Sequence, residues 1–114
     1  MLRTKRIHEE PSGDDGIRIL VDRLWPRGIS REKATIDRWE KDLAPGTELR
    51  RWFGHDPAKW EEFLRRYRAE LKGKEEALAR LRREAGMETV TLLYAARDEE
   101  HNNAVALKRF VEEG

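Results

Sequence analysis

The chain has no cysteine and no glutamine, and its only two asparagines are neighbours, Asn102 and Asn103. The lack of cysteine excludes disulfide bonds, cysteine-based zinc sites and thiol catalysis. No apolar run approaches the roughly 18 residues that a membrane helix needs, and the charged N-terminal stretch lacks the apolar centre of a signal peptide. We therefore expect a soluble, cytoplasmic protein that has no membrane partner.

Charge is abundant but nearly balanced, with 24 basic and 23 acidic residues and a formal net charge of +1. This balance argues against a broad nucleic-acid-binding surface, although a local basic patch is compatible with it. Many charges, few amides and no cysteine resemble the composition of thermophile proteins. The length of 114 residues, with no linker-like segment, predicts one domain spanning residues 1–114.

Hydrophobic patterning predicts an α/β fold. Residues 2–8 and 17–21 have the alternation of strands, and residues 89–95 are apolar enough for a strand buried on both faces. Asp56 and Pro57 open a long helical pattern that Gly73 interrupts and Gly86 ends, so it forms either one kinked helix or two. Strands separated by helices predict a single domain with a small central, at least partly parallel sheet packed by helices.

Shorter segments complete this prediction. Residues 34–45 fit either a short helix or an extended connection, and Thr47 is a candidate cap for a short helix that Gly54 ends. The aromatic stripe of Trp60, Phe63 and Tyr67 is expected to be core. Asp98 is expected to cap the last helix.

Polar residues follow two of the predicted strands. Ligands of open α/β sheets bind beyond the carboxyl ends of the strands. If strands 17–21 and 89–95 are neighbours, one rim collects the polar side chains that follow them: Asp22, Arg23, Trp25, Arg27, Arg97, Asp98, His101 and Asn102. The arginines suit a phosphate or carboxylate, and the tryptophan suits a ring. In the competing interpretation, Asp22 pairs with an arginine and Trp25 covers the core.

The start of the last helix is expected to form a second part of this rim. If Asp98 caps it, then Asp98, Glu99 and Glu100 fill its first turn and would repel a phosphate, so any bound anion must rely on the arginines. His101 and Asn102 are expected to face the ligand, while Asn103 only completes the turn. An asparagine both donates and accepts hydrogen bonds, which suits a base edge or a sugar hydroxyl.

The sequence gives little support for a metal site or a catalytic site. A metal set drawn from Asp22, Asp98 and His101, with His55 or His8, lacks any diagnostic spacing. There is no G-x-S-x-G motif and no glycine-rich phosphate loop, and acid–base catalysis by His101 rests on location alone. The sequence predicts no metal site and no cofactor, and it leaves open whether the protein is an enzyme.

Three strings, "DGIRILVDRLWPRGISREKA", "DLAPGTELRRWFGHDPAKWEEF" and "TLLYAARDEEHNNAVALK", resemble the YeaO-like branch of the family named domain of unknown function 488. The resemblance spans nearly the whole chain. It implies a small bacterial or archaeal α/β protein with no established activity, and it suggests that Arg50 and His55 form another wall of the site. The chain departs from the family pattern at Gly46, where serine is usual, and at Asn103, where histidine is usual.

The leading hypothesis is a binding site for a small ligand that is polar or nucleotide-like. Ligands that contain a phosphate group are included. Its candidate residues are Asp22, Arg23, Trp25, Arg27, Arg50, His55, Asp98, His101 and Asn102. The alternative is a nucleic-acid or protein interaction module without catalysis, suggested by the arginines of the long helix. The same arginines suit pairs with glutamates four residues away on that helix better than they suit nucleic acid. A homodimer without a ligand stays open.

Overall fold

Four strands form one parallel sheet in the computed structural model, which describes residues 1–114. The strands are β1 (Leu2–Arg6), β2 (Ile17–Leu20), β3 (Arg38–Trp39) and β4 (Val90–Tyr94). Their order is β1-β4-β2-β3, and each adjacent pair is parallel. The α/β prediction is confirmed, and so is the expectation that β2 and β4 are neighbours. Their carboxyl ends therefore lie side by side.

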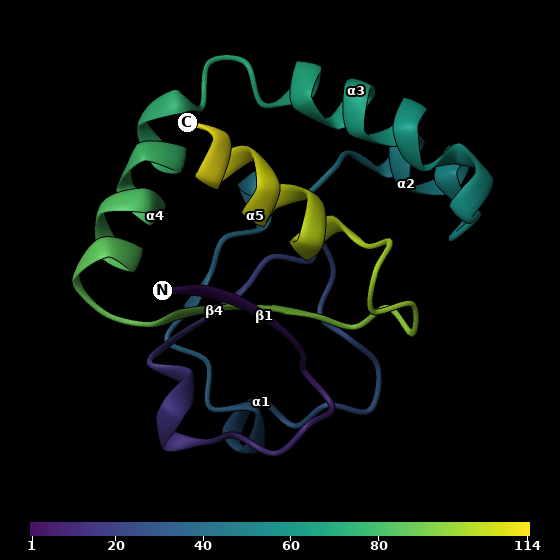
Figure 1. The fold of residues 1–114 in the computed structure, drawn as a ribbon. Coiled ribbons are helices and arrows are strands. Elements are labelled where there is room, and N and C mark those ends of the chain that lie inside the picture. Colours follow the sequence, from purple (N-terminus) through teal and green to yellow (C-terminus); the bar gives the residue numbers. More distant parts are fainter.

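Five α-helices pack around this sheet: α1 (Arg31–Ala34), α2 (Thr47–Phe53), α3 (Trp60–Glu70), α4 (Glu75–Met87) and α5 (Asn103–Glu113). Figure 1 shows α2 to α5 gathered on one side of the sheet and the short α1 on the other. None of these helices combines the length and the apolar character required to cross a membrane.

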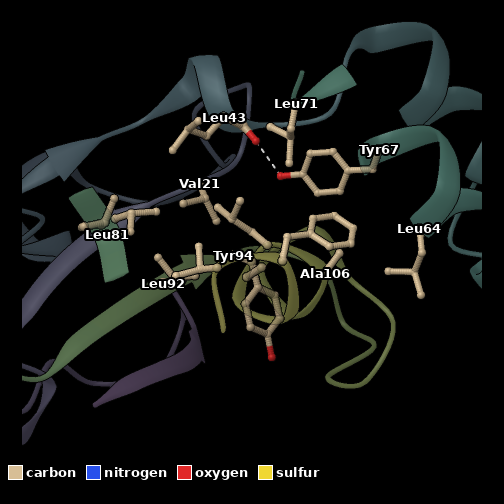
Figure 2. Packing of buried hydrophobic residues seen from close by; sticks show 14 of the residues in the cluster. Val21, Leu43, Leu64, Tyr67, Leu71, Leu81, Leu92, Tyr94 and Ala106 are labelled. Carbon is tan, nitrogen blue, oxygen red and sulfur yellow. Dashed lines mark hydrogen bonds between the residues drawn. The ribbon is translucent and has the colours of Figure 1, made fainter. Parts of the chain in front are cut away.

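The sheet separates two apolar clusters because successive strand residues point to opposite faces. Ile19 and Leu92 pack under the large helices, while Leu20 and Leu93 pack on the side of α1. In the larger cluster, shown in Figure 2, the hydroxyl of fully buried Tyr67 donates a hydrogen bond to a backbone carbonyl oxygen at 2.5 Å. Burial raises the pKa of Tyr67 above its ordinary value. Phe63 and Tyr67 are therefore core, as predicted, while half-buried Trp60 packs against the cluster from its edge.

The bounds of the helices differ in part from those that the sequence predicts. Gly73, with φ of 89°, separates α3 from α4, so the long pattern is two helices, and α4 runs through Gly86 to end one residue later. The ambiguous segment, residues 34–45, contains β3 and then a single 3₁₀ turn, Lys41–Leu43. The predicted short helix is α2, ended by Gly54 in the left-handed conformation. No pattern in the sequence had indicated α1.

The predicted start of the last helix is wrong. The carboxylate of Asp98 accepts hydrogen bonds from the backbone N–H groups two and three residues later, which makes a turn rather than a helix cap. Asn102 is the N-cap of α5, and its side chain accepts from the N–H of Val105 at 2.9 Å. The first turn of α5 consequently contains no acidic residue. The carboxylates that were expected to repel a phosphate are therefore absent from this turn.

Candidate functional site

A pocket of about 440 Å³ lies where β2 and β4 end. One wall is made by the residues that follow these two strands, a second by α2, and a third by the start of α5. We call it the rim pocket. It brings together five of the nine candidate residues, which are Asp22, Arg23, Arg50, His55 and Asn102. Its position matches the carboxyl-end location at which α/β sheets bind ligands.

Asp22 is the carboxylate of the rim pocket. Its Oδ2 accepts a hydrogen bond from the backbone N–H of Ala95, which follows β4, and its Oδ1 accepts from Nδ2 of Asn103, each at 3.0 Å. Burial raises the pKa of Asp22, while these two hydrogen bonds and the charges of Arg50 and His55 oppose the rise. Asp22 forms no ion pair. The carboxylate thus ties two strand ends to α5 and keeps free lone pairs.

The two asparagines have different structural roles. Asn102 is 2% exposed, and its Nδ2 donates to the carbonyl oxygen of Asp98 at 2.9 Å while its Oδ1 caps α5. Asn103, expected only to complete the turn, extends its side chain to Asp22 and to the carbonyl oxygen of Val21, at 2.8 Å for the latter. Together they fix the first turn of α5 against the ends of the strands.

The start of α5 presents unused donors. Residues at a helix N-terminus have N–H groups without an intrahelical acceptor. The capping side chain of Asn102 satisfies the third N–H of α5, but the backbone N–H groups of Asn103 and Ala104 donate to no protein acceptor. Both asparagines are among the residues that line the rim pocket. The positive end of the α5 dipole therefore borders the pocket.

Positive side chains surround the same space. Arg23, Arg50 and Arg51 line the rim pocket, and their side chains form no hydrogen bond, ion pair or contact with an aromatic ring. Only Arg27 and Arg97 share this unpaired state among the other arginines. His55 also lines the pocket, and its backbone has φ of 59°, an uncommon conformation for a residue with a side chain.

Trp25 and Arg27 do not line the rim pocket. The indole N–H of Trp25 donates to the carbonyl oxygen of Ile29 at 2.8 Å, and its ring meets that of Trp39 edge-on at 5.5 Å between centroids. Trp25 thus packs on the apolar cluster at the α1 side of the sheet. Arg27 is exposed in the turn that it shares with Gly28.

Asp98 and His101 form a separate pair in the loop before α5. Nδ1 of His101 lies 3.0 Å from Oδ2 of Asp98, and the imidazole ring meets Trp60 edge-on at 5.3 Å. Hydrogen bonds, first that from the backbone N–H of Glu100, hold the pKa of Asp98 below its ordinary value. Neither side chain lines the rim pocket. No three His, Cys, Asp or Glu side chains are grouped in a way that could hold a metal ion.

Sequence reasoning missed three polar residues of the rim pocket, which are Thr47, Arg51 and Asn103. Thr47 was expected only as a helix cap. Arg51 adjoins Arg50 in α2, so the doublet "RR" was its only signal. The rarity of amides did single out Asn103, but the misplaced start of α5 assigned it to the helix turn.

The arginines of α3 and α4, which suggested a nucleic-acid surface, are largely neutralised within the protein. The ion pairs are Arg65 and Arg66 with Glu62, Arg68 with Glu113, Arg80 with Glu84, and Arg83 with Glu76. This outcome matches the competing interpretation of that helix face as paired surface charge.

Comparison with known proteins gives a family but no activity. A family model described as "Inactive DUF488-N3 subclade" matches residues 1–114. An uncharacterized protein of Mycobacterium tuberculosis is 40% identical over 110 residues, which are 96% of this chain and 92% of that protein. The uncharacterized protein YeaO of Escherichia coli is 40% identical over 106 residues, 93% of this chain and 92% of YeaO. No solved structure matches the chain.

Proposed function

The chain belongs to the DUF488 family, and we propose that it is a binding domain whose rim pocket holds the phosphate group of a small molecule. The main support for this proposal is that unpaired positive charges and free hydrogen-bond donors are concentrated in the rim pocket. The side chains of Arg23, Arg50 and Arg51 have no protein partner there, and α5 contributes Asn103, whose backbone N–H group is free.

Phosphate is the anion that this arrangement favours. A helix N-terminus without acidic side chains is a ready anion site, because its N–H groups and its dipole both favour negative charge. Guanidinium groups add bidentate, charge-assisted hydrogen bonds to phosphate oxygens. Several such groups around one pocket suit a doubly charged oxyanion better than a single carboxylate.

Binding without turnover is supported by the description of the family model as an inactive subclade. The competing role, nucleic-acid binding through the helical arginines, has less support, because those arginines are already paired with glutamates. A surface neutralised in this way releases few counterions on contact with nucleic acid, and counterion release provides much of that affinity.

Thermal unfolding at constant, low ionic strength tests the proposal, with inorganic phosphate as the probe. A ligand at 100 times its dissociation constant stabilises the folded state by about 2.7 kcal/mol. For a chain of this length the midpoint should rise by roughly 10 °C. Phosphate also stabilises proteins nonspecifically by exclusion from their surface, so a variant of the pocket has to separate the two effects.

Arg50→Ala is that variant and Arg97→Ala is its matched control. Both arginines are exposed and unpaired, so neither change should alter stability by more than about 0.5 kcal/mol. Only Arg50 lines the rim pocket. We expect Arg50→Ala to need at least about tenfold more phosphate for the same midpoint shift, and Arg97→Ala to behave as wild type. Equal responses from all three proteins would refute the proposal.

A further inference from the structure

The rim pocket contains one carboxylate that a bare anion cannot use. Asp22 lies at the end of β2 and borders the same space as Arg50 and the start of α5. Through Asn103, which donates to it at 3.0 Å, Asp22 is held directly beside the first turn of α5. A phosphate bound at that turn lies near a like charge, and this repulsion lowers its affinity unless the ligand also offers a donor.

Asp22 is equipped to accept such a donor. Each of its oxygens accepts one hydrogen bond from the protein, from Ala95 and from Asn103, and no ion pair occupies the remaining lone pairs. The two protein hydrogen bonds fix the carboxylate in place, so a further acceptor site has a defined position. Its partial burial makes an added hydrogen bond stronger than on an open surface.

The donor that fits is a hydroxyl rather than an ammonium group. Arg23, Arg50, Arg51 and His55 line the same pocket and disfavour a second cation there. A neutral hydroxyl meets no such repulsion. The pocket volume of about 440 Å³ also falls in the range of sites for small organic molecules, which is larger than a bare phosphate needs.

We propose that Asp22 accepts a hydrogen bond from a ligand hydroxyl and so makes the rim pocket selective for phosphorylated sugars over inorganic phosphate. This inference rests on the proposed function, because the phosphate group still binds at α5 and the arginines. It adds a specificity-determining residue and a class of ligand, in which a hydroxyl and a phosphate belong to one polyhydroxy molecule.

Calorimetric titration of the wild-type protein separates the two proposals. Ribose 5-phosphate should bind at least about tenfold more tightly than inorganic phosphate, since it adds one hydrogen bond to a charged acceptor. O-phosphoserine, which offers an ammonium group instead, should bind less tightly than ribose 5-phosphate. If phosphate binds and ribose 5-phosphate is no tighter, or if phosphoserine is the tightest, the inference about Asp22 is overturned while the phosphate site stands. If none of the three binds, the proposed function itself fails.

Asp22→Asn adds a direct test of the residue. An asparagine must turn its NH₂ toward either the N–H of Ala95 or Nδ2 of Asn103, so some loss of stability is expected and titration is done well below the midpoint of unfolding. We expect the variant to bind phosphate at least as well as wild type and to lose the preference for ribose 5-phosphate. Glu99→Gln removes an exposed carboxylate outside the pocket and should keep the preference. A preference that survives Asp22→Asn contradicts the role of Asp22.

Discussion

Replacing Asn102 should show that its buried side chain holds the start of α5 in place beside the rim pocket. In Asn102→Ala, α5 loses the cap bond to the N–H of Val105, which costs about 1 kcal/mol. The carbonyl oxygen of Asp98 loses its donor at 2.9 Å, which costs about 1 kcal/mol more. Because the side chain is only 2% exposed, its removal also leaves a small void. Together these losses predict a fall of roughly 2–3 kcal/mol in the free energy of unfolding.

Urea unfolding followed by far-ultraviolet circular dichroism measures this change, with an unchanged slope as the sign that only stability has altered. Asn102→Ser should recover about 1 kcal/mol, because serine caps a helix nearly as well as asparagine but cannot reach the carbonyl oxygen of Asp98. Glu99→Ala is the matched control and should stay within about 0.5 kcal/mol of wild type. If Asn102→Ala is as stable as this control, Asn102 does not hold α5 in place.

Three further changes probe the fold around the site. Glu84→Gln breaks a two-bond ion pair between α4 and β3 and should cost about 1 kcal/mol at neutral pH, since both partners keep some contact with water. The arginine partner lowers the pKa of Glu84 from 4.5. The stabilisation is therefore present above pH 4.5 and is lost as pH falls through the lowered value. A stability difference between wild type and Glu84→Gln that persists in acid contradicts this role of the ion pair. Tyr67→Phe should cost about 1–3 kcal/mol in urea unfolding, because a buried carbonyl oxygen loses its donor. Gly16→Ala should lower the free energy of unfolding by at least about 3 kcal/mol, because φ of Gly16 is 63° and a Cβ would lie 2.0 Å from a backbone oxygen. Gly13→Ala should lower it much less, because the space around Gly13 is open.

The sheet and its large helices could be predicted because their signals are local and repeated. Residues 89–95 are nearly continuously apolar, and β4 is buried along its whole length. The glycine break and the aromatic spacing likewise described α3 and α4 before their packing was known. The two-residue β3 could not be separated from a helix, since periodicity over so short a segment does not distinguish them.

The candidate site was predicted in part, and the errors have one main cause. Asp98 and Asn102 are both good helix caps, and the sequence does not say which one caps α5. Choosing Asp98 moved the acidic residues into the helix and Asn103 away from Asp22. Trp25 and Arg27 were grouped with Asp22 because they are close in sequence, but the chain turns after Asp22 and places Trp25 on the opposite side of the sheet.

A titration with inorganic phosphate, followed by the backbone amide resonances of the protein, tests the phosphate site most directly. We expect saturable shifts of the Asn103 and Ala104 amides, whose N–H groups lack a protein acceptor, together with shifts of the amides around Arg50. These shifts should weaken in Arg50→Ala and persist in Arg97→Ala. Shifts that do not saturate, or that fall on the arginines of α3 instead of the start of α5, would contradict the phosphate site.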